Sequence, residues 1–149
     1  MIKAGIIGGA GYTAGELTRL LICHPEVELK WISSTSNAGN RVDSVHQGLI
    51  GETDLVFVAD TPLSEIDVLF LCTPHGFSKP FLEEHKGEIP ESLRIIDLAQ
   101  DFRIADGVHD FVYGLPELNR ERITTATKEM VHPADFAGFK LRAPGIDMY

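Results

Sequence analysis

The sequence is poor in the residues that mark several classes of protein. It has two cysteines in 149 residues, Cys23 and Cys72, too few for a disulfide framework or a cysteine-ligated metal cluster. No apolar run approaches the length of a membrane span, and no charged and cleavable leader precedes the first apolar segment. Basic residues are also few, 13 against 22 acidic ones, which disfavours nucleic acid or anionic membranes as partners. We therefore expect a cytoplasmic protein without metal, nucleic-acid or membrane partners.

What is present is a chain with enough apolar residues, 44%, to bury the core of about one domain. Apolar runs bounded by turn residues alternate with helical patterns, which is typical of βαβ units and predicts an α/β fold. The expected strands span 4–7, 27–33, 55–58, 68–72 and 93–98, and the expected helices span 14–23 and 77–85. We predict a Rossmann-type, doubly wound and mostly parallel sheet, with 68–72 central, 55–58 at an edge and 93–98 buried.

The chain beyond residue 119 has a different character. Prolines and glycines such as Pro133, Gly138 and Pro144 interrupt every long periodic pattern there. No strand or helix is predicted in this part. We expect a cofactor-binding domain over residues 1–119 and a divergent tail over 120–149.

A glycine-rich segment follows the first expected strand and opens the first expected helix. It runs from Gly8 to Ala14 and has the form G-x-x-G-x-x-A; we call it the glycine turn. In dinucleotide-binding domains, the first glycine, here Gly8, permits a tight turn, and the second, here Gly11, lets the backbone approach a pyrophosphate. Amides at the helix start then face the phosphates. The alternative is an ordinary tight turn without a ligand.

The end of the second expected strand bears on which nicotinamide cofactor is bound. An NAD site usually has an acidic residue there that accepts a hydrogen bond from the ribose 2′-hydroxyl. This sequence has Ser33, Ser36 and then Arg41 instead, and hydroxyl and guanidinium groups suit a 2′-phosphate. The sequence therefore favours NADP, the alternative being a polar loop that touches no ligand.

Several short motifs give the chain a resemblance to a known family. They occur in the order Gly11-Tyr12-Thr13 with Glu16-Leu17, Ser36-Asn37-Ala38-Gly39, Val45-His46, Pro74-His75-Gly76, Ile96-Asp97-Leu98 with Asp101-Phe102-Arg103, and Tyr113-Gly114-Leu115-Pro116-Glu117. From residue 1 to about 119 the chain resembles N-acetyl-γ-glutamyl-phosphate reductase of arginine biosynthesis, a relative of aspartate-semialdehyde dehydrogenase. The 113–117 motif argues against aspartate-semialdehyde dehydrogenase itself, whereas aminoadipate-phosphate reductase stays an alternative.

The resemblance implies a chemistry and a set of cofactor-binding residues. In the family, a cysteine thiolate attacks an acyl phosphate, phosphate leaves, and NADPH reduces the thioester to a semialdehyde. It also implies a small-molecule acyl-phosphate substrate and a homo-oligomer. By motif, the residues expected at the pyrophosphate are Gly8, Gly11, Tyr12 and Thr13, those near the 2′-phosphate are Ser33, Ser36 and Arg41, and those beside the nicotinamide are Thr73, Pro74 and His75.

Some residues allow a purely structural interpretation. His75 either lines the nicotinamide or shapes the turn that follows it. His46 is expected to be a core or helix-surface residue. Asp97, Asp101 and Arg103 are expected to form a structural ion-pair cluster at a strand end rather than an acid/base set. The segment 113–117 is expected to be a rigid loop.

The chain departs from the family pattern at the nucleophile. The family cysteine begins a long helix, which lowers its pKa, whereas the matching stretch here is His132-Pro133-Ala134-Asp135. A carboxylate cannot form a thioester, and we expect the family's second, α+β substrate domain to be missing. Cys23 and Cys72 are expected to be buried, so no residue is assigned a catalytic role.

Two hypotheses follow. The chain is an NADP-dependent acyl-phosphate reductase in an inactive or partial version, with a truncated or frameshifted end, or it is a catalytically silent NADP-binding or interaction module.

Overall fold

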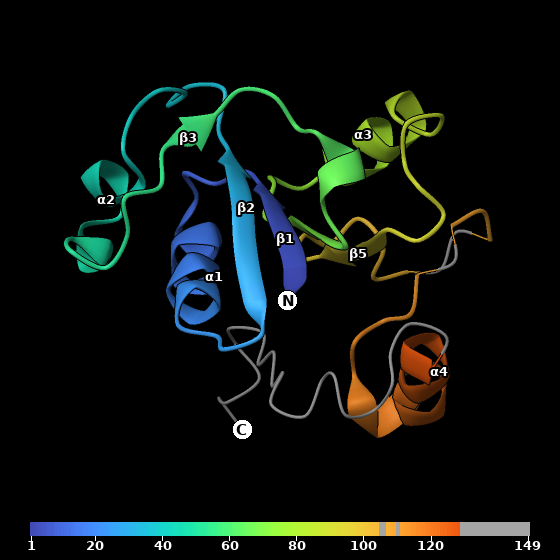
Figure 1. Cartoon of the computed structure of the whole chain (residues 1–149). Coiled ribbons are helices and arrows are strands. Elements are labelled where there is room, and N and C mark those ends of the chain that lie inside the picture. The colour runs from blue at the N-terminus through green and yellow to red at the C-terminus, as the bar shows by residue number, and fades with distance from the viewer. Residues whose placement is uncertain (105–106, 110, 129–149) are drawn as a thin grey trace. The chain divides into compact units, whose positions relative to one another are not determined.

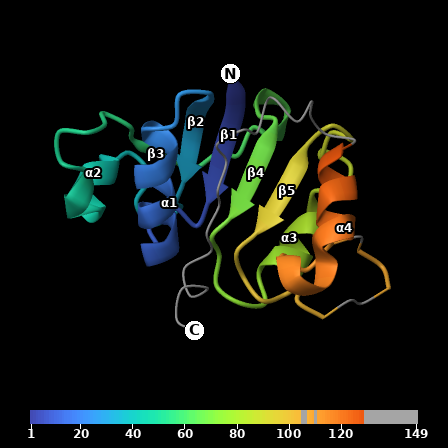
Figure 2. The ribbon, with the colours of Figure 1, turned by 90° about the horizontal axis from the view of Figure 1, so that it is seen from below.

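A computed structural model describes residues 1–104, 107–109 and 111–128 of the chain. Its centre is a sheet of five strands in the order β3-β2-β1-β4-β5, in which every neighbouring pair is parallel. The strands are β1 (Ile2–Ile7), β2 (Val27–Ser33), β3 (Phe57–Val58), β4 (Val68–Leu71) and β5 (Arg94–Asp97). Figure 1 and Figure 2 show them side by side, with β2, β1 and β4 in the middle. The α/β doubly wound prediction is confirmed.

Helices connect consecutive strands, and a further helix follows β5. They are α1 (Tyr12–Ile22) between β1 and β2, α2 (Val42–Val45) before β3, α3 (Ser78–Glu84) between β4 and β5, and α4 (Pro116–Lys128). Short 3-10 turns lie at Gln47–Leu49 and Leu63–Glu65. From β1 the chain continues to β2 and then β3, toward one edge of the sheet, whereas from β4 it continues to β5, at the other edge. Right-handed crossovers therefore place α1 and α3 on opposite faces.

The core of the sheet consists of apolar side chains from its inner strands. Ile6, Ile32, Phe70 and Leu69 are fully buried, as continuous apolar strands in a parallel sheet require. The only tryptophan, Trp31, is 4% exposed and lies over Gly5, where a β-carbon would come within 2.6 Å of the indole ring. A residue larger than glycine does not fit at position 5, because the indole ring of Trp31 occupies the space that its side chain would take.

Two sequence expectations need correction. The strand over 93–98 was expected to be buried, but every residue of β5 is only partly buried, because among the described residues this strand pairs with β4 alone and forms an edge of the sheet. A helix was not expected after residue 119, yet α4 continues to Lys128, with a non-helical residue at Asn119. Its polar sequence lacks the apolar periodicity on which the prediction depended, and Pro116 at its first position is the signal that was available.

By its internal contacts the chain divides into two compact units, the first of which is Met1–Asp101. In the second, Phe102 stacks on Phe111 with ring centroids 4.0 Å apart. The backbone carbonyl of Tyr113 accepts hydrogen bonds from the Leu115 amide and the Asn119 side chain, so part of the expected rigid loop folds onto the start of α4. The expected boundary at residue 119 stays a prediction.

Candidate functional site at the carboxyl edge of the sheet

The glycine turn lies at the point where the direction of strand addition reverses, between β1 and β4. Gly8 follows β1 and has φ +81°, a conformation that favours glycine. A β-carbon at Gly8 would collide with the backbone carbonyl of Cys72, which follows β4. The Gly9 amide donates to the carbonyl of Ser33, at the end of β2 (2.8 Å). Three strand ends therefore converge on this turn, which is where open α/β sheets bind ligands.

Backbone N–H groups of the glycine turn are left free for a ligand. Gly11 is the N-cap of α1, no side chain caps the helix, and its first turn has no acidic residue. Within the residues that the structure describes, the amides of Ala10, Tyr12 and Thr13 donate to no protein acceptor. Such amides at a helix start, with the helix dipole behind them, bind anions.

Small residues make this geometry possible. Ala14 is fully buried, so α1 packs closely on the sheet at this position. At Gly11 a β-carbon would lie 3.3 Å from the Gly8 carbonyl oxygen, a tight contact. Tyr12 is 85% exposed at the start of the helix, so its ring is accessible to a ligand. The geometry fits a pyrophosphate at Gly8, Gly11, Tyr12 and Thr13.

Serine and asparagine side chains gather after β2. The Asn37 side-chain amide donates to the hydroxyls of Ser36 (3.0 Å) and Ser34 (3.3 Å). Ser33 is 4% exposed, and its hydroxyl donates to the carbonyl of Ala59 (3.5 Å). Ser34 and Asn37 were missed as candidates, although their polar side chains directly follow a buried strand. No acidic residue occurs between Ser33 and Arg41.

The guanidinium of Arg41 is held by two carboxylates of the chain itself. It makes a two-pronged hydrogen bond to Asp43, with Nε–Oδ1 2.9 Å and Nη2–Oδ2 2.6 Å, and a further one to Asp54 (3.0 Å). Asp43 raises the pKa of Arg41, and Arg41 in turn lowers the pKa of Asp43. An anionic ligand at Arg41 would therefore compete with these carboxylates.

The loop after β4 contains the residues expected beside the nicotinamide. Thr73 makes a hydroxyl–hydroxyl hydrogen bond with Ser78 (3.1 Å), and the ring of His75 accepts a hydrogen bond from the Gln100 amide (3.3 Å). Asp101 accepts hydrogen bonds from the backbone amides of Gly76 (2.7 Å) and Ser78 (3.0 Å). These amides hold the pKa of Asp101 below its usual range. The start of α3 is thus closed by a carboxylate of the chain.

The expected ion-pair cluster of Asp97, Asp101 and Arg103 stays a prediction, because Arg103 belongs to the second compact unit. Asp97 accepts hydrogen bonds from the Ser78 hydroxyl (2.8 Å) and the Ala99 amide, while its second oxygen is buried and has no partner among the described residues. Burial raises the pKa of Asp97. Both carboxylates therefore accept hydrogen bonds from donors of the first unit itself.

Cys72 is poorly suited to be a nucleophile, and Cys23 lies at the opposite edge of the sheet from the glycine turn. Burial, aided by the nearby charge of Asp97, raises the pKa of Cys72 to about 12, so its thiolate is scarce at neutral pH. Cys23 was expected to be buried, but it is exposed, since it follows the last residue of α1 and leaves the packed face. The stretch His132-Pro133-Ala134-Asp135, where the family cysteine was expected, lies outside the described residues.

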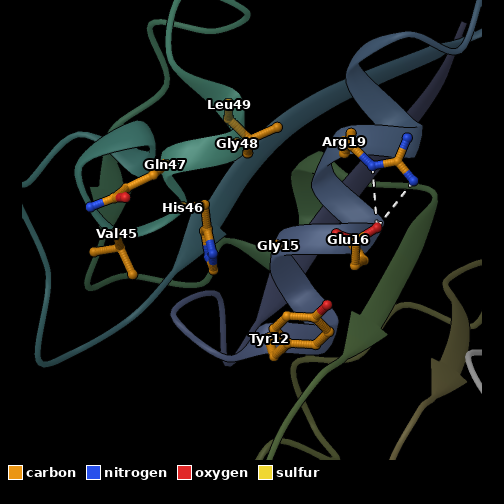
Figure 3. Close-up of a pocket in the computed structure, with 9 residues that line it drawn as sticks. All are labelled: Tyr12, Gly15, Glu16, Arg19, Val45, His46, Gln47, Gly48 and Leu49. Carbon is orange, nitrogen blue, oxygen red and sulfur yellow. Dashed lines mark hydrogen bonds and ion pairs between the residues drawn. The ribbon is translucent and has the colours of Figure 1, made fainter.

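A shallow groove lies on the outer side of the glycine turn (Figure 3). It has a volume of about 230 Å³ and lies between α1 and residues 45–49. Glu16 and Arg19 form an ion pair on its α1 side (3.0 Å). On the other side, the ring of His46 reaches the carbonyl of Gly9 (2.7 Å) and makes an edge contact with Phe57. The expectation of a core or helix-surface residue missed this contact with the turn.

Comparisons with known proteins agree with this geometry. Residues 3–126 match the family described as semialdehyde dehydrogenase, NAD binding domain. The chain is similar to proteins named N-acetyl-gamma-glutamyl-phosphate reductase: 63% identical to that of Bacteroides fragilis and 61% to that of Phocaeicola vulgatus, each over 137 residues. These alignments cover 92% of the chain but 42% of each relative, so the chain spans less than half the length of these proteins.

The fold is also similar to a solved structure. The crystal structure of aspartate semialdehyde dehydrogenase with NADP from Candida albicans matches with a TM-score of 0.53 and 22% identity, covering 70% of the chain and 31% of that protein. Among the described residues, no helix is long and apolar enough to span a bilayer.

Proposed function

The chain belongs to the semialdehyde dehydrogenase family by its NAD-binding domain, and from this premise we propose that it is the NADP-binding part of an N-acetyl-γ-glutamyl-phosphate reductase of arginine biosynthesis. The observation that carries the proposal is the set of free amides in the glycine turn, at the reversal point of the sheet. The names of relatives up to 63% identical support the choice of substrate. Aminoadipate phosphate is the alternative substrate.

The residues present fit a nicotinamide dinucleotide. The free amides of Ala10, Tyr12 and Thr13 hold the pyrophosphate, and Gly8 and Gly11 leave room for it. Thr73, Pro74 and His75 line the nicotinamide, at the end of the strand next to β1. When bound, the cofactor supplies hydride, and the protein orients it.

We propose NADP rather than NAD because the segment after β2 has hydroxyls and a cation where NAD sites have a carboxylate. Ser33, Ser36 and Arg41 are assigned to the 2′-phosphate. The ion pair of Arg41 with Asp43 fixes the guanidinium in place. The phosphate then either shares the guanidinium with the Asp43 carboxylate or displaces that carboxylate from it.

The covalent step of the reaction is assigned to residues outside this chain. Cys72 is a buried thiol whose pKa lies near 12, and Asp135 stands where the sequence pattern puts the nucleophile. We propose that residues 1–119 form the cofactor domain and 120–149 adjoin the substrate domain, in a cytoplasmic homo-oligomer. A catalytically silent NADP-binding module is the second candidate, which the lack of a suitable thiol favours.

The test is a calorimetric titration of the 149-residue chain with NADPH and with NADH. We expect both to bind and NADPH to bind more tightly; absence of binding by either contradicts the proposal. In a second assay, the chain receives N-acetylglutamate semialdehyde, phosphate and NADP. We expect no reduction of NADP, because the thiol of Cys72 is protonated at neutral pH and Cys23 lies at the opposite edge of the sheet from the glycine turn. Measurable turnover would overturn the assignment of the covalent step.

A further inference from the structure

We propose that His46 is a positioning residue that fixes the orientation of the Gly9–Ala10 peptide and thereby aims the free amides of the glycine turn at the cofactor phosphates. The inference rests on the proposed cofactor function. It starts from one contact, the 2.7 Å hydrogen bond in which the Nε2–H of His46 donates to the carbonyl oxygen of Gly9. This bond joins residues 37 positions apart in the sequence.

The hydrogen bond determines where the next amide points. In a trans peptide the carbonyl and the N–H point in opposite directions. With the Gly9 carbonyl directed to His46, the N–H of Ala10 points away from the ring, and it is one of the amides without a protein acceptor. The neighbouring amides of Gly9 and Gly11 are already bonded to Ser33 and Gly8. His46 therefore controls the remaining freedom of the turn.

The backbone of His46 is itself held firmly. Its amide donates to the carbonyl of Val42 (2.9 Å), and its carbonyl accepts from the amide of Leu49 (2.9 Å). Val42 and Leu49 are 0% and 2% exposed, so both ends of this short segment are anchored in the core. Figure 3 shows the ring directed from this segment toward the first turns of α1. An anchored donor is what a positioning role requires.

Gly15 gives an independent sign of the same arrangement. It lies inside α1, where glycine is a poor helix former. A β-carbon at Gly15 would lie 2.5 Å from Nδ1 of His46, so alanine would push the ring out of its place. The ring contact is the physical reason for a glycine here. It also provides a way to move His46 without changing it.

The experiment measures the NADPH affinity of the full chain and of five variants, one of them a control, by calorimetry. His46→Leu removes the donor, and Gly15→Ala displaces the ring; each is expected to weaken binding about tenfold, the worth of one hydrogen bond. In the double variant His46→Leu/Gly15→Ala the loss is expected to be less than the sum of the single losses. His46→Gln keeps an N–H donor of similar reach and is expected to restore most of the affinity.

The matched control is Gly48→Ala, on the opposite wall of the same groove. A β-carbon at Gly48 meets no atom within 4 Å, so the affinity is expected to be that of the natural chain. Because Gly15→Ala improves helix propensity, its stability in urea should be unchanged or higher while its affinity falls. A merely structural role of His46 would instead lower stability and affinity together.

A measurement without cofactor separates this inference from the proposed function. The amides of Gly9 and Gly11 are hydrogen-bonded in the turn, and His46→Leu is expected to raise their hydrogen exchange about tenfold relative to strand amides such as that of Ile6. If the natural chain binds no NADPH but this exchange effect is seen, the cofactor function fails and the positioning contact stands. Exchange and affinity equal to those of the natural chain in both His46→Leu and Gly15→Ala would overturn the inference.

Discussion

Two βαβ units of the same architecture lie side by side in the sheet and differ in the charge at their helix starts. In the first, β1–α1–β2, the helix begins at an uncapped glycine, and the strand that follows is succeeded by serines and Arg41. In the second, β4–α3–β5, the carboxylate of Asp101 lies on the amides at the start of α3. The first unit is open to an anion, and the second is closed by one.

Topology alone therefore does not determine which of the two helix starts can accept a phosphate. Both turns lie at the carboxyl edge, where open α/β sheets bind ligands. A phosphate at α3 would meet the charge of Asp101, whereas at α1 it meets free amides. What distinguishes the units is one carboxylate that follows β5 and has no counterpart between Ser33 and Arg41 after β2.

The largest expected effect on cofactor binding comes from placing a carboxylate at the helix start of the first βαβ unit, as the second βαβ unit already has. Gly11→Asp puts a carboxylate beside the free amides of α1, and its repulsion of phosphate is expected to weaken NADPH binding about 100-fold or more. Gly11→Ala is the control for side-chain size, since its β-carbon meets only the tight 3.3 Å contact with Gly8. Calorimetry measures both. Equal affinities of Gly11→Asp and the natural chain would remove the glycine turn from the site.

A smaller effect is expected from reversing the charge after β2. Arg41→Glu should weaken NADPH binding about tenfold and NADH binding much less, because the lost interaction is a charged hydrogen bond to the 2′-phosphate. The matched change Asp43→Asn frees the guanidinium from its carboxylate partner and should strengthen NADPH binding. Competition titrations with the two cofactors measure both variants. Equal losses for NADPH and NADH in Arg41→Glu would contradict the NADP assignment.

The smallest effect on cofactor binding is expected from removing the carboxylate at the helix start of the second βαβ unit. Asp101→Ala removes the acceptor for the amides of Gly76 and Ser78, which should lower the free energy of unfolding by about 1 kcal/mol. NADPH affinity should change less than threefold or so, because the α1 amides are independent of this cap. Urea unfolding and calorimetry check the two expectations. A larger loss of affinity than of stability would assign Asp101 to the cofactor site.

The same variant carries a pH signature. The pKa of Asp101 is lowered in the folded chain, so the stability that this carboxylate contributes is present above its ordinary pKa and disappears as the pH falls through its folded value. Asp101→Ala should therefore lose less stability than the natural chain on acidification below about pH 4. If stability falls equally with pH in Asp101→Ala and in the natural chain, the Asp101 carboxylate does not contribute to stability.

Much of the fold could be predicted because its signals are local. Continuous apolar runs such as Val68–Leu71 and the start signal before α1 depend on neighbouring residues only. The partial burial of β5 could not be predicted, since it depends on which strand lies beside it. The start of α4 at Pro116 has a local signal, but a helix without a clear apolar stripe gives no periodicity.

The candidate site could be predicted only where its signals are local, as for the fold. The glycine turn and the polar segment after β2 are recognisable in sequence because each directly follows a strand. The bonds of Asp101 to Gly76 and of His46 to Gly9 join residues 25 and 37 positions apart, and no local pattern specifies such pairs. Arg41 was recognised as a cation, but its neutralisation by Asp54 across a loop was not.

The indole that rests on Gly5 makes the chain its own optical reporter. Because there is one tryptophan and it is buried between β1 and β2, its emission comes from a single, rigid place in the sheet. A reduced nicotinamide absorbs where tryptophan emits, whereas the oxidised ring does not. Energy transfer from Trp31 therefore distinguishes docking of the two redox states without any label.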